Sequence, residues 1–151
     1  MKESTGWALV GTQFGVLAAL LVLPAGDLWS RSVITGVIAG VLIGLGAIIA
    51  LAAGRGLGRA LTPLPIPRAD GQLVTTGVFR YVRHPIYSGL LLVGAGLTAW
   101  GASWVHFLAW GLLWLVLNTK AHFEEKLLAE RYPEYEQYCA TAGRFVPRVS
   151  R

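Results

Sequence analysis

The sequence predicts an all-α protein, a polytopic membrane bundle of about four transmembrane helices followed by a cytoplasmic amphipathic helical segment. Hydrophobic residues make up 54% of its 151 residues and charged residues only 14%, whereas soluble domains carry about 25% charged residues. The apolar residues form long unbroken runs, while the core of a soluble protein shows them at helical or strand spacing. The length fits one domain, and we therefore treat residues 1–151 as a single membrane-embedded unit.

Residues 1–53 contain the first two expected spans. The run from Gly6 to Leu23 carries no charge and is long enough to cross a bilayer. A signal peptide is the alternative, but its apolar region is typically about 7–15 residues, so we interpret the run as a retained span. Val33 to Ala53 forms the second span.

Three glycines of the second span, Gly36, Gly40 and Gly44, recur at four-residue spacing and share one helix face. Small residues on one face let another membrane helix approach closely. The partner helix can belong to the same chain or to a second copy, so a homo-oligomer through this face is one expectation.

The remainder divides into a connector (54–84), a helical hairpin (85–118) and a tail (119–151). In the connector, the alternate prolines of Thr62 to Pro67 exclude a continuous helix, and a turn is expected at 69–72. The hairpin holds two spans, Pro85–Ala102 and Trp104–Asn118, joined tightly at Gly101–Ser103. The tail is polar and is expected to form two helices, Lys120–Tyr132 and Glu134–Ala142.

The basic residues indicate an orientation. With four spans, twelve of the thirteen Lys and Arg residues lie on one side and only Arg31 on the other. The positive-inside rule then places both termini in the cytoplasm. Basic residues beside spans also contact lipid headgroups, so the net charge of +5 does not indicate a nucleic-acid partner. Ten Arg against three Lys, with abundant Ala and Gly, suggest a GC-rich bacterial genome and hence an inner-membrane protein.

The segment Arg83-His84-Pro85-Ile86-Tyr87 is the first candidate site. Proline is favoured at the first helical position, and the free N–H groups of a helix start attract anions. With Arg83 and His84 beside it, this start suits the anionic group of a ligand. A headgroup anchor is the simpler alternative.

The segment Lys120 to Tyr132 is the second candidate site. Glu124 shares a helix face with Leu127 and Leu128, at i+3 and i+4, and a carboxylate on an apolar face needs a cationic partner. Lys120, one turn back, or a ligand's ammonium group can supply it. Glu125 points elsewhere and by itself is expected to be solvated. Cations and an acid at one membrane face suit a zwitterion such as S-adenosylmethionine, without selecting it.

These motifs carry a family resemblance. "GVFRYVRHPIYSG", a helical hairpin, "EEKLL" and "RYPEYEQYCATAGRFVP" resemble, in that order, the isoprenylcysteine carboxyl methyltransferase family of integral membrane enzymes, and phospholipid methyltransferases share related features. The resemblance covers about residues 71–148, while the first two spans match only as membrane helices. It implies transfer of a methyl group from S-adenosylmethionine to a lipophilic acceptor, an isoprenylcysteine-like carboxylate or another small lipid.

The resemblance also implies roles for individual residues. Those that would bind the cofactor are His84, Pro85, Tyr87, Gly89, Glu124 and Glu125. Arg144 would bind the substrate within a closing C-terminal segment. Family members often have an arginine two residues before the paired acids, where this chain has His122, with Lys120 two residues earlier. Arg83, Lys120 and His122 are therefore the candidate catalytic residues that orient the acceptor or the sulfonium. No metal site is expected.

Two other functions stay open. Membrane sterol reductases share a similar "RHP…Y" start and a tyrosine-rich tail and use NADPH, although the Glu124-Glu125 pair favours methyl transfer. A non-enzymatic membrane bundle is the other alternative. The acceptor is equally open: prenylated cysteine, a phospholipid amine, a small thiol or an isoprenoid acid fits, and no general base is assigned.

Overall fold

The computed structural model describes residues 3–66 and 71–148 and is entirely helical over these ranges apart from loops and one isolated bridge. The elements are α1 (Glu3–Val22), α2 (Val33–Leu57), η1 (Gly58–Ala60), η2 (Gly77–Arg80), α3 (Pro85–Gly101), α4 (Trp104–Arg131) and α5 (Tyr135–Thr141). The expected all-α bundle is confirmed. The turn expected at 69–72 lies partly outside the described residues.

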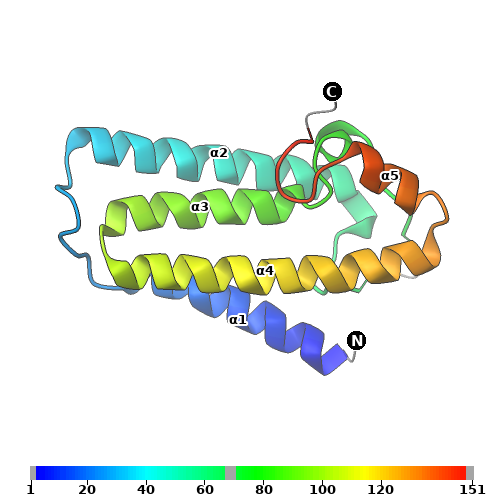
Figure 1. The fold of residues 1–151 in the computed structure, drawn as a ribbon, viewed down its shortest axis with the longest axis horizontal. Helices are drawn as coiled ribbons and strands as arrows, with labels where there is room; N and C mark the ends of the chain where they lie inside the picture. Colours follow the sequence, from blue (N-terminus) through cyan, green and yellow to red (C-terminus); the bar gives the residue numbers. More distant parts are fainter. Residues whose placement is uncertain (1–2, 67–70, 149–151) are drawn as a thin grey trace.

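The four long helices run antiparallel to their neighbours in the chain (Figure 1). α2 packs along α3, and α4 packs on α3 and α1. α1 lies on α4 and diverges from it toward its own start. The connector, α5 and the C-terminal segment gather where α3 begins, and the short α1–α2 and α3–α4 connections lie at the opposite end. Most of the basic residues that the structure describes belong to the connector and the C-terminal segment and therefore lie at the end of the bundle where α3 begins.

Within residues 3–66 and 71–148, two helices, α1 and α2, are long and apolar enough to cross a membrane, and α3 is a shorter apolar helix of 17 residues. Large apolar side chains are exposed along the bundle, including Val33, Leu51 and Leu108, which are 83%, 59% and 74% exposed. Large apolar side chains exposed in such numbers are typical of a surface that contacts lipid or another protein. Together with the all-helical architecture, it fits a membrane bundle.

The glycines that bring helices together differ from those expected. A Cβ on Gly40 or Gly44 would meet nothing within 4 Å, and one on Gly36 would only touch Trp100. Instead, Gly46 of α2 faces Gly89 of α3, where a Cβ on either would collide with the backbone carbonyl of the other. The prediction that Gly36, Gly40 and Gly44 bring another helix of the same chain close is therefore wrong. That they bring a second copy close stays a prediction.

Helix α4 runs without a break from Trp104 to Arg131, so the fourth span and the first tail helix are one rod rather than two elements. No glycine or proline lies between Gly111 and Pro133, so this stretch lacks the two residue types that most disfavour a helix interior. The helix therefore carries its polar half rigidly beneath the apolar half. The tight hairpin is confirmed, with Ala102 in the left-handed conformation at φ 47°.

Candidate functional site

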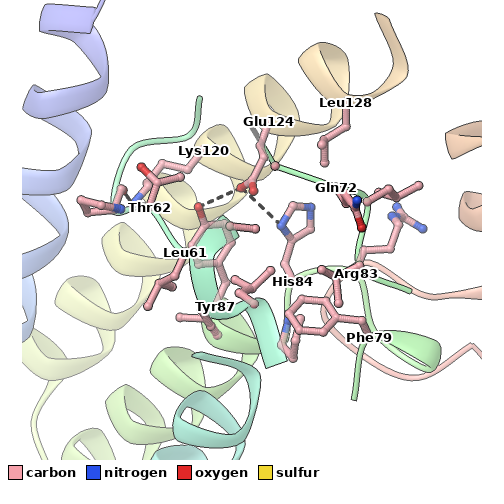
Figure 2. A pocket seen from close by; sticks show the side chains of 18 of the residues that line it. Leu61, Thr62, Gln72, Phe79, Arg83, His84, Tyr87, Lys120, Glu124 and Leu128 are labelled. Carbon is pink, nitrogen blue, oxygen red and sulfur yellow. Dashed lines mark hydrogen bonds and ion pairs between the residues drawn. The ribbon is translucent and has the colours of Figure 1, made fainter. Parts of the chain in front are cut away.

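A cavity of about 390 Å³ lies where α3 begins (Figure 2). α3, α4 and α5 form part of its wall, and α1 and the connector complete it. Most lining side chains are apolar or aromatic. The charged or titratable groups among the lining residues, tyrosines aside, are Arg83, His84, Lys120 and Glu124. A mostly apolar cavity with a few convergent polar groups is the usual form of a small-molecule site.

Glu124 projects into the middle of this cavity between His84 and Lys120 (Figure 2). The Tyr87 hydroxyl donates to its Oε2 at 3.1 Å, and Nδ1 of His84 lies 3.7 Å from the same atom. The start of α3 and the polar half of α4 therefore meet, as the sequence predicted. A carboxylate offers about four lone-pair positions, and this side chain is 27% exposed, so Glu124 keeps capacity for a ligand's donor.

Glu125, by contrast, is enclosed by three basic side chains. Arg83 donates from Nε at 3.0 Å, and Nε2 of His84 lies 3.1 Å from the same Oε1. Arg144 binds with two nitrogens, Nε to Oε1 at 3.1 Å and Nη2 to Oε2 at 2.5 Å. The side chain is only 13% exposed, so the expectation that Glu125 is solvated is wrong, because its partners come from other segments.

The pKa of Glu125 reflects this enclosure. Burial raises the pKa, but the hydrogen bonds of His84 and Arg144 and the charges of His84 and Arg83 lower it by more. The pKa is therefore lowered to about 2. The carboxylate is therefore ionised at any physiological pH and acts as the anion that joins α4 to α3 and the C-terminal segment.

The guanidinium groups of Arg83 and Arg144 form their hydrogen bonds with other groups of the chain. Besides Glu125, Arg83 donates from Nη1 to the carbonyl oxygen of Ala142 at 2.5 Å, and Arg144 donates from Nη1 to Oδ1 of Asn118 at 3.1 Å. From the sequence we expected the anionic group of a ligand to be the partner of Arg83. In the structure Glu125 takes that place, and a direct contact of Arg83 with a ligand stays a prediction.

The C-terminal segment lies against the start of α3, where the resemblance expected a closing segment. The N–H of Arg83 donates to the Gly143 carbonyl at 2.8 Å, and that of His84 donates to the Arg144 carbonyl at 3.1 Å. The His84 ring packs edge-on against Phe145 and lies parallel to the Tyr87 ring. These contacts fix the orientation of the imidazole beside the cavity.

Lys120 is only 2% exposed and lines the cavity from α4. Its Nζ donates to Oε1 of Gln13 at 2.6 Å and to the Pro63 carbonyl at 3.2 Å, and lies 5.3 Å from the centre of the Tyr87 ring. The expected pairing with Glu124 is replaced by neutral oxygens of α1 and the connector. This one ammonium group therefore ties both segments to the site.

The structure separates the other predicted residues. His84, Pro85 and Tyr87 line the main cavity, and Gly89 instead meets Gly46 of α2. His122 is exposed on the other side of α4, beside a second, shallower hollow of about 490 Å³ that Glu125 and Arg144 also line. In the described residues no group of three or more His, Cys, Asp or Glu side chains could hold a metal ion.

Sequence reasoning missed Gln13 and Tyr135, which both line the cavity. A signal for Gln13 was present, because polar residues inside transmembrane segments are rare and usually have a partner. Tyr135 gave none beyond its place in a tyrosine-rich tail, since its position depends on how α5 folds back.

A family model described as phospholipid methyltransferase matches residues 34–135, about two-thirds of the chain. The chain belongs to this family. The resemblance to integral membrane methyltransferases is thereby confirmed, and membership implies a methyltransferase at a membrane. The match also includes the second span, which the sequence interpretation had left without any likeness.

Two curated proteins are similar over part of their length. The cobalt-zinc-cadmium resistance protein CzcN of Cupriavidus metallidurans is 33% identical over 88 residues, which cover 55% of this chain and 39% of that protein. An uncharacterised protein of Schizosaccharomyces pombe, C594.04c, is 35% identical over 81 residues, 49% of this chain and 23% of its own. The similarity thus spans well under half the length of either relative.

Proposed function

We propose that this protein is an integral membrane methyltransferase that uses S-adenosylmethionine and methylates a lipophilic acceptor. The observation that carries the proposal is Glu124, a carboxylate with free acceptor capacity in a largely apolar cavity, inside a chain of the phospholipid methyltransferase family. A partly buried carboxylate that faces an apolar cavity favours a cationic partner, and the cofactor's amino-acid end carries an ammonium group.

The residues around the cavity suit this cofactor. Glu124 would hold the ammonium group, with Tyr87 and His84 fixing the carboxylate through the 3.1 Å and 3.7 Å contacts. When bound, S-adenosylmethionine supplies a methyl group that its sulfonium already activates. The chain's own contribution is then to position the reactants and exclude water, which can lower a barrier by about 7–11 kcal/mol in favourable cases.

The acceptor side of the cavity lies toward Gln13 and Lys120. Phe14 and Leu61 line the cavity and are also 58% and 46% exposed on the outer surface, so they form an apolar rim through which a hydrocarbon chain can reach the cavity. The ammonium group of Lys120 would orient the acceptor's reacting end. A carboxylate of the isoprenylcysteine kind suits this cation best and needs no general base, whereas an amine acceptor would have to lose a proton.

We further place the protein in a bacterial inner membrane, with both termini, the cavity and every Lys and Arg except Arg31 on the cytoplasmic side. The distribution of Lys and Arg supports this orientation. The helix face of Gly36, Gly40 and Gly44 is where a second copy would pack.

The NADPH alternative has less support. A nicotinamide cofactor of that kind needs cations for its phosphates, but the guanidinium groups of Arg83 and Arg144 are bound to Glu125. A purely structural bundle would not explain an acid placed inside an apolar cavity.

The test is methyl transfer in membranes that contain the protein. Membranes with the wild-type chain are incubated with methyl-labelled S-adenosylmethionine, and the lipid phase is analysed for labelled product. We expect transfer by the wild type and by Glu130→Gln, an exposed acid on the same helix, and loss of at least tenfold in Glu124→Gln. Binding of NADPH but not of S-adenosylhomocysteine to the purified protein, or transfer unchanged in Glu124→Gln, contradicts the proposal.

A further inference from the structure

Three tyrosines of the tail use their hydroxyl groups differently. The Tyr132 hydroxyl donates to the Gly71 carbonyl at 2.6 Å, and the Tyr138 hydroxyl donates to the Phe79 carbonyl at 2.6 Å. Both bonds fasten the tail to the connector. Tyr135 lies between them in the sequence and is 3% exposed, but its hydroxyl has no hydrogen-bond partner among the described residues.

A buried hydroxyl without a partner is destabilising, because it loses its hydrogen bonds to water and gains none in return. In native structures such a group needs an explanation, and a functional role at a site is one of those established for them. Burial raises the pKa of Tyr135 above its ordinary value, so the group stays protonated and can donate.

The position of Tyr135 indicates which part of a ligand it would meet. Its side chain forms part of the wall of the main cavity and of the second hollow behind it. It belongs with Tyr138 and Ala142 to a buried cluster against which Leu73, Leu128 and Tyr132 pack, and its ring meets that of Tyr138 edge-on at 5.9 Å. This flat, apolar and aromatic lining suits a nucleoside rather than a charged amino-acid group, for which Glu124 is already in place.

We propose that the Tyr135 hydroxyl is a hydrogen-bond donor to the nucleoside portion of the cofactor, at an oxygen of the ribose or a ring nitrogen of the base. The hydroxyl is enclosed in the wall of the cavity, so a small rotation of the ring accompanies binding. The inference rests on the proposed function, and it divides the cavity into an ammonium end at Glu124 and a nucleoside end at Tyr135.

The test compares two probes, S-adenosylhomocysteine and 5′-methylthioadenosine, which has the nucleoside but lacks the ammonium and carboxylate groups. Their binding to the purified full-length protein is measured by calorimetry. Tyr135→Phe should weaken both probes by the same factor, about three- to tenfold for one neutral hydrogen bond. Glu124→Gln should weaken S-adenosylhomocysteine alone.

The melting temperature without ligand supplies a second readout. Tyr135→Phe should melt no lower than the wild type, because the substitution removes a hydroxyl that has no partner, whereas Tyr138→Phe should melt lower. Equal binding of both probes to the wild type and Tyr135→Phe would overturn the inference and leave the proposed function intact. A loss confined to S-adenosylhomocysteine, or a melting temperature lowered as in Tyr138→Phe, would also overturn it. Wild-type protein that binds neither probe would overturn the proposed function itself.

Discussion

Arg144 holds Glu125 through a two-pronged ion pair, with Nε and Nη2 at 3.1 Å and 2.5 Å from the two carboxylate oxygens. The pair joins the C-terminal segment to α4, and Arg83 and His84 bring the start of α3 to the same carboxylate. Of the two adjacent acids, Glu125 therefore assembles the site, while Glu124 stays available inside it.

Replacing Glu125 by Gln should destabilise the fold, because three basic side chains would lose their shared anion. Breaking a buried ion pair costs about 3–5 kcal/mol, and an exposed one at most about 1 kcal/mol. For this partly accessible cluster we expect about 2 kcal/mol. Denaturant unfolding in detergent micelles measures it, with Glu130→Gln as the matched control. Equal stability of the two variants would show that the ion pairs of Glu125 do not stabilise the fold.

The same carboxylate should make stability depend on pH in the acid range. Its pKa is about 2 in the fold against an ordinary 4.5, so the unfolded chain binds its proton first as pH falls. The stabilisation is fully present above about pH 4.5 and is lost as pH falls toward 2. Melting temperatures between pH 2 and 6 should therefore show the gap between wild type and Glu125→Gln narrowing through this window. A gap that stays constant across the window would refute the assignment.

Two glycines of α2 should respond oppositely to alanine. Gly46→Ala places a Cβ against the Gly89 carbonyl, and overpacking of this kind costs about 1–3 kcal/mol. Gly40→Ala meets nothing within 4 Å and gains helix propensity, so it should be neutral or slightly stabilising. Thermal unfolding in detergent compares them. A marked loss in Gly40→Ala instead would indicate that another chain covers this face.

Lys120 and Gln13 should be energetically coupled, because the Nζ to Oε1 bond of 2.6 Å links α4 to α1. A hydrogen bond to a charged group contributes about 1.5–3 kcal/mol. In a double-mutant cycle with Lys120→Met and Gln13→Leu, the double variant should lose less stability than the sum of the single variants. Additive losses would show that the contact contributes nothing.

His122→Ala should leave methyl transfer within about twofold of the wild type, since surface substitutions away from a site have small effects. The side chain is exposed and lies outside the main cavity, although its sequence position made it a catalytic candidate. Rates from labelled S-adenosylmethionine decide the matter. A tenfold loss of methyl-transfer rate in a stably folded variant would show that His122 takes part in the reaction.

Much of the architecture follows from local features of the sequence. The apolar runs predicted helices that the structure has as α1, α2 and α3, and Pro85 marked the start of α3. The proximity of His84 and Glu124 was also predicted correctly. The continuity of α4 was missed because a change from apolar to polar composition was interpreted as a boundary, whereas such a change leaves the backbone hydrogen bonds of a helix intact and no proline interrupts the chain before Pro133.

The sequence by itself determined the helices, their approximate ends and the residue types gathered at one end of the bundle, because length, hydrophobicity and capping act locally along the chain. Only the tertiary structure decided that three basic side chains enclose Glu125 while Glu124 faces the cavity, that Gly46 and Gly89 form the close contact, and that Lys120 donates to Gln13. Each of these contacts joins segments far apart in the sequence, 19 residues for Arg144 and Glu125 and 107 for Lys120 and Gln13. Helical periodicity fixes the direction of a side chain relative to its own helix, and the partner depends on which other segment packs there.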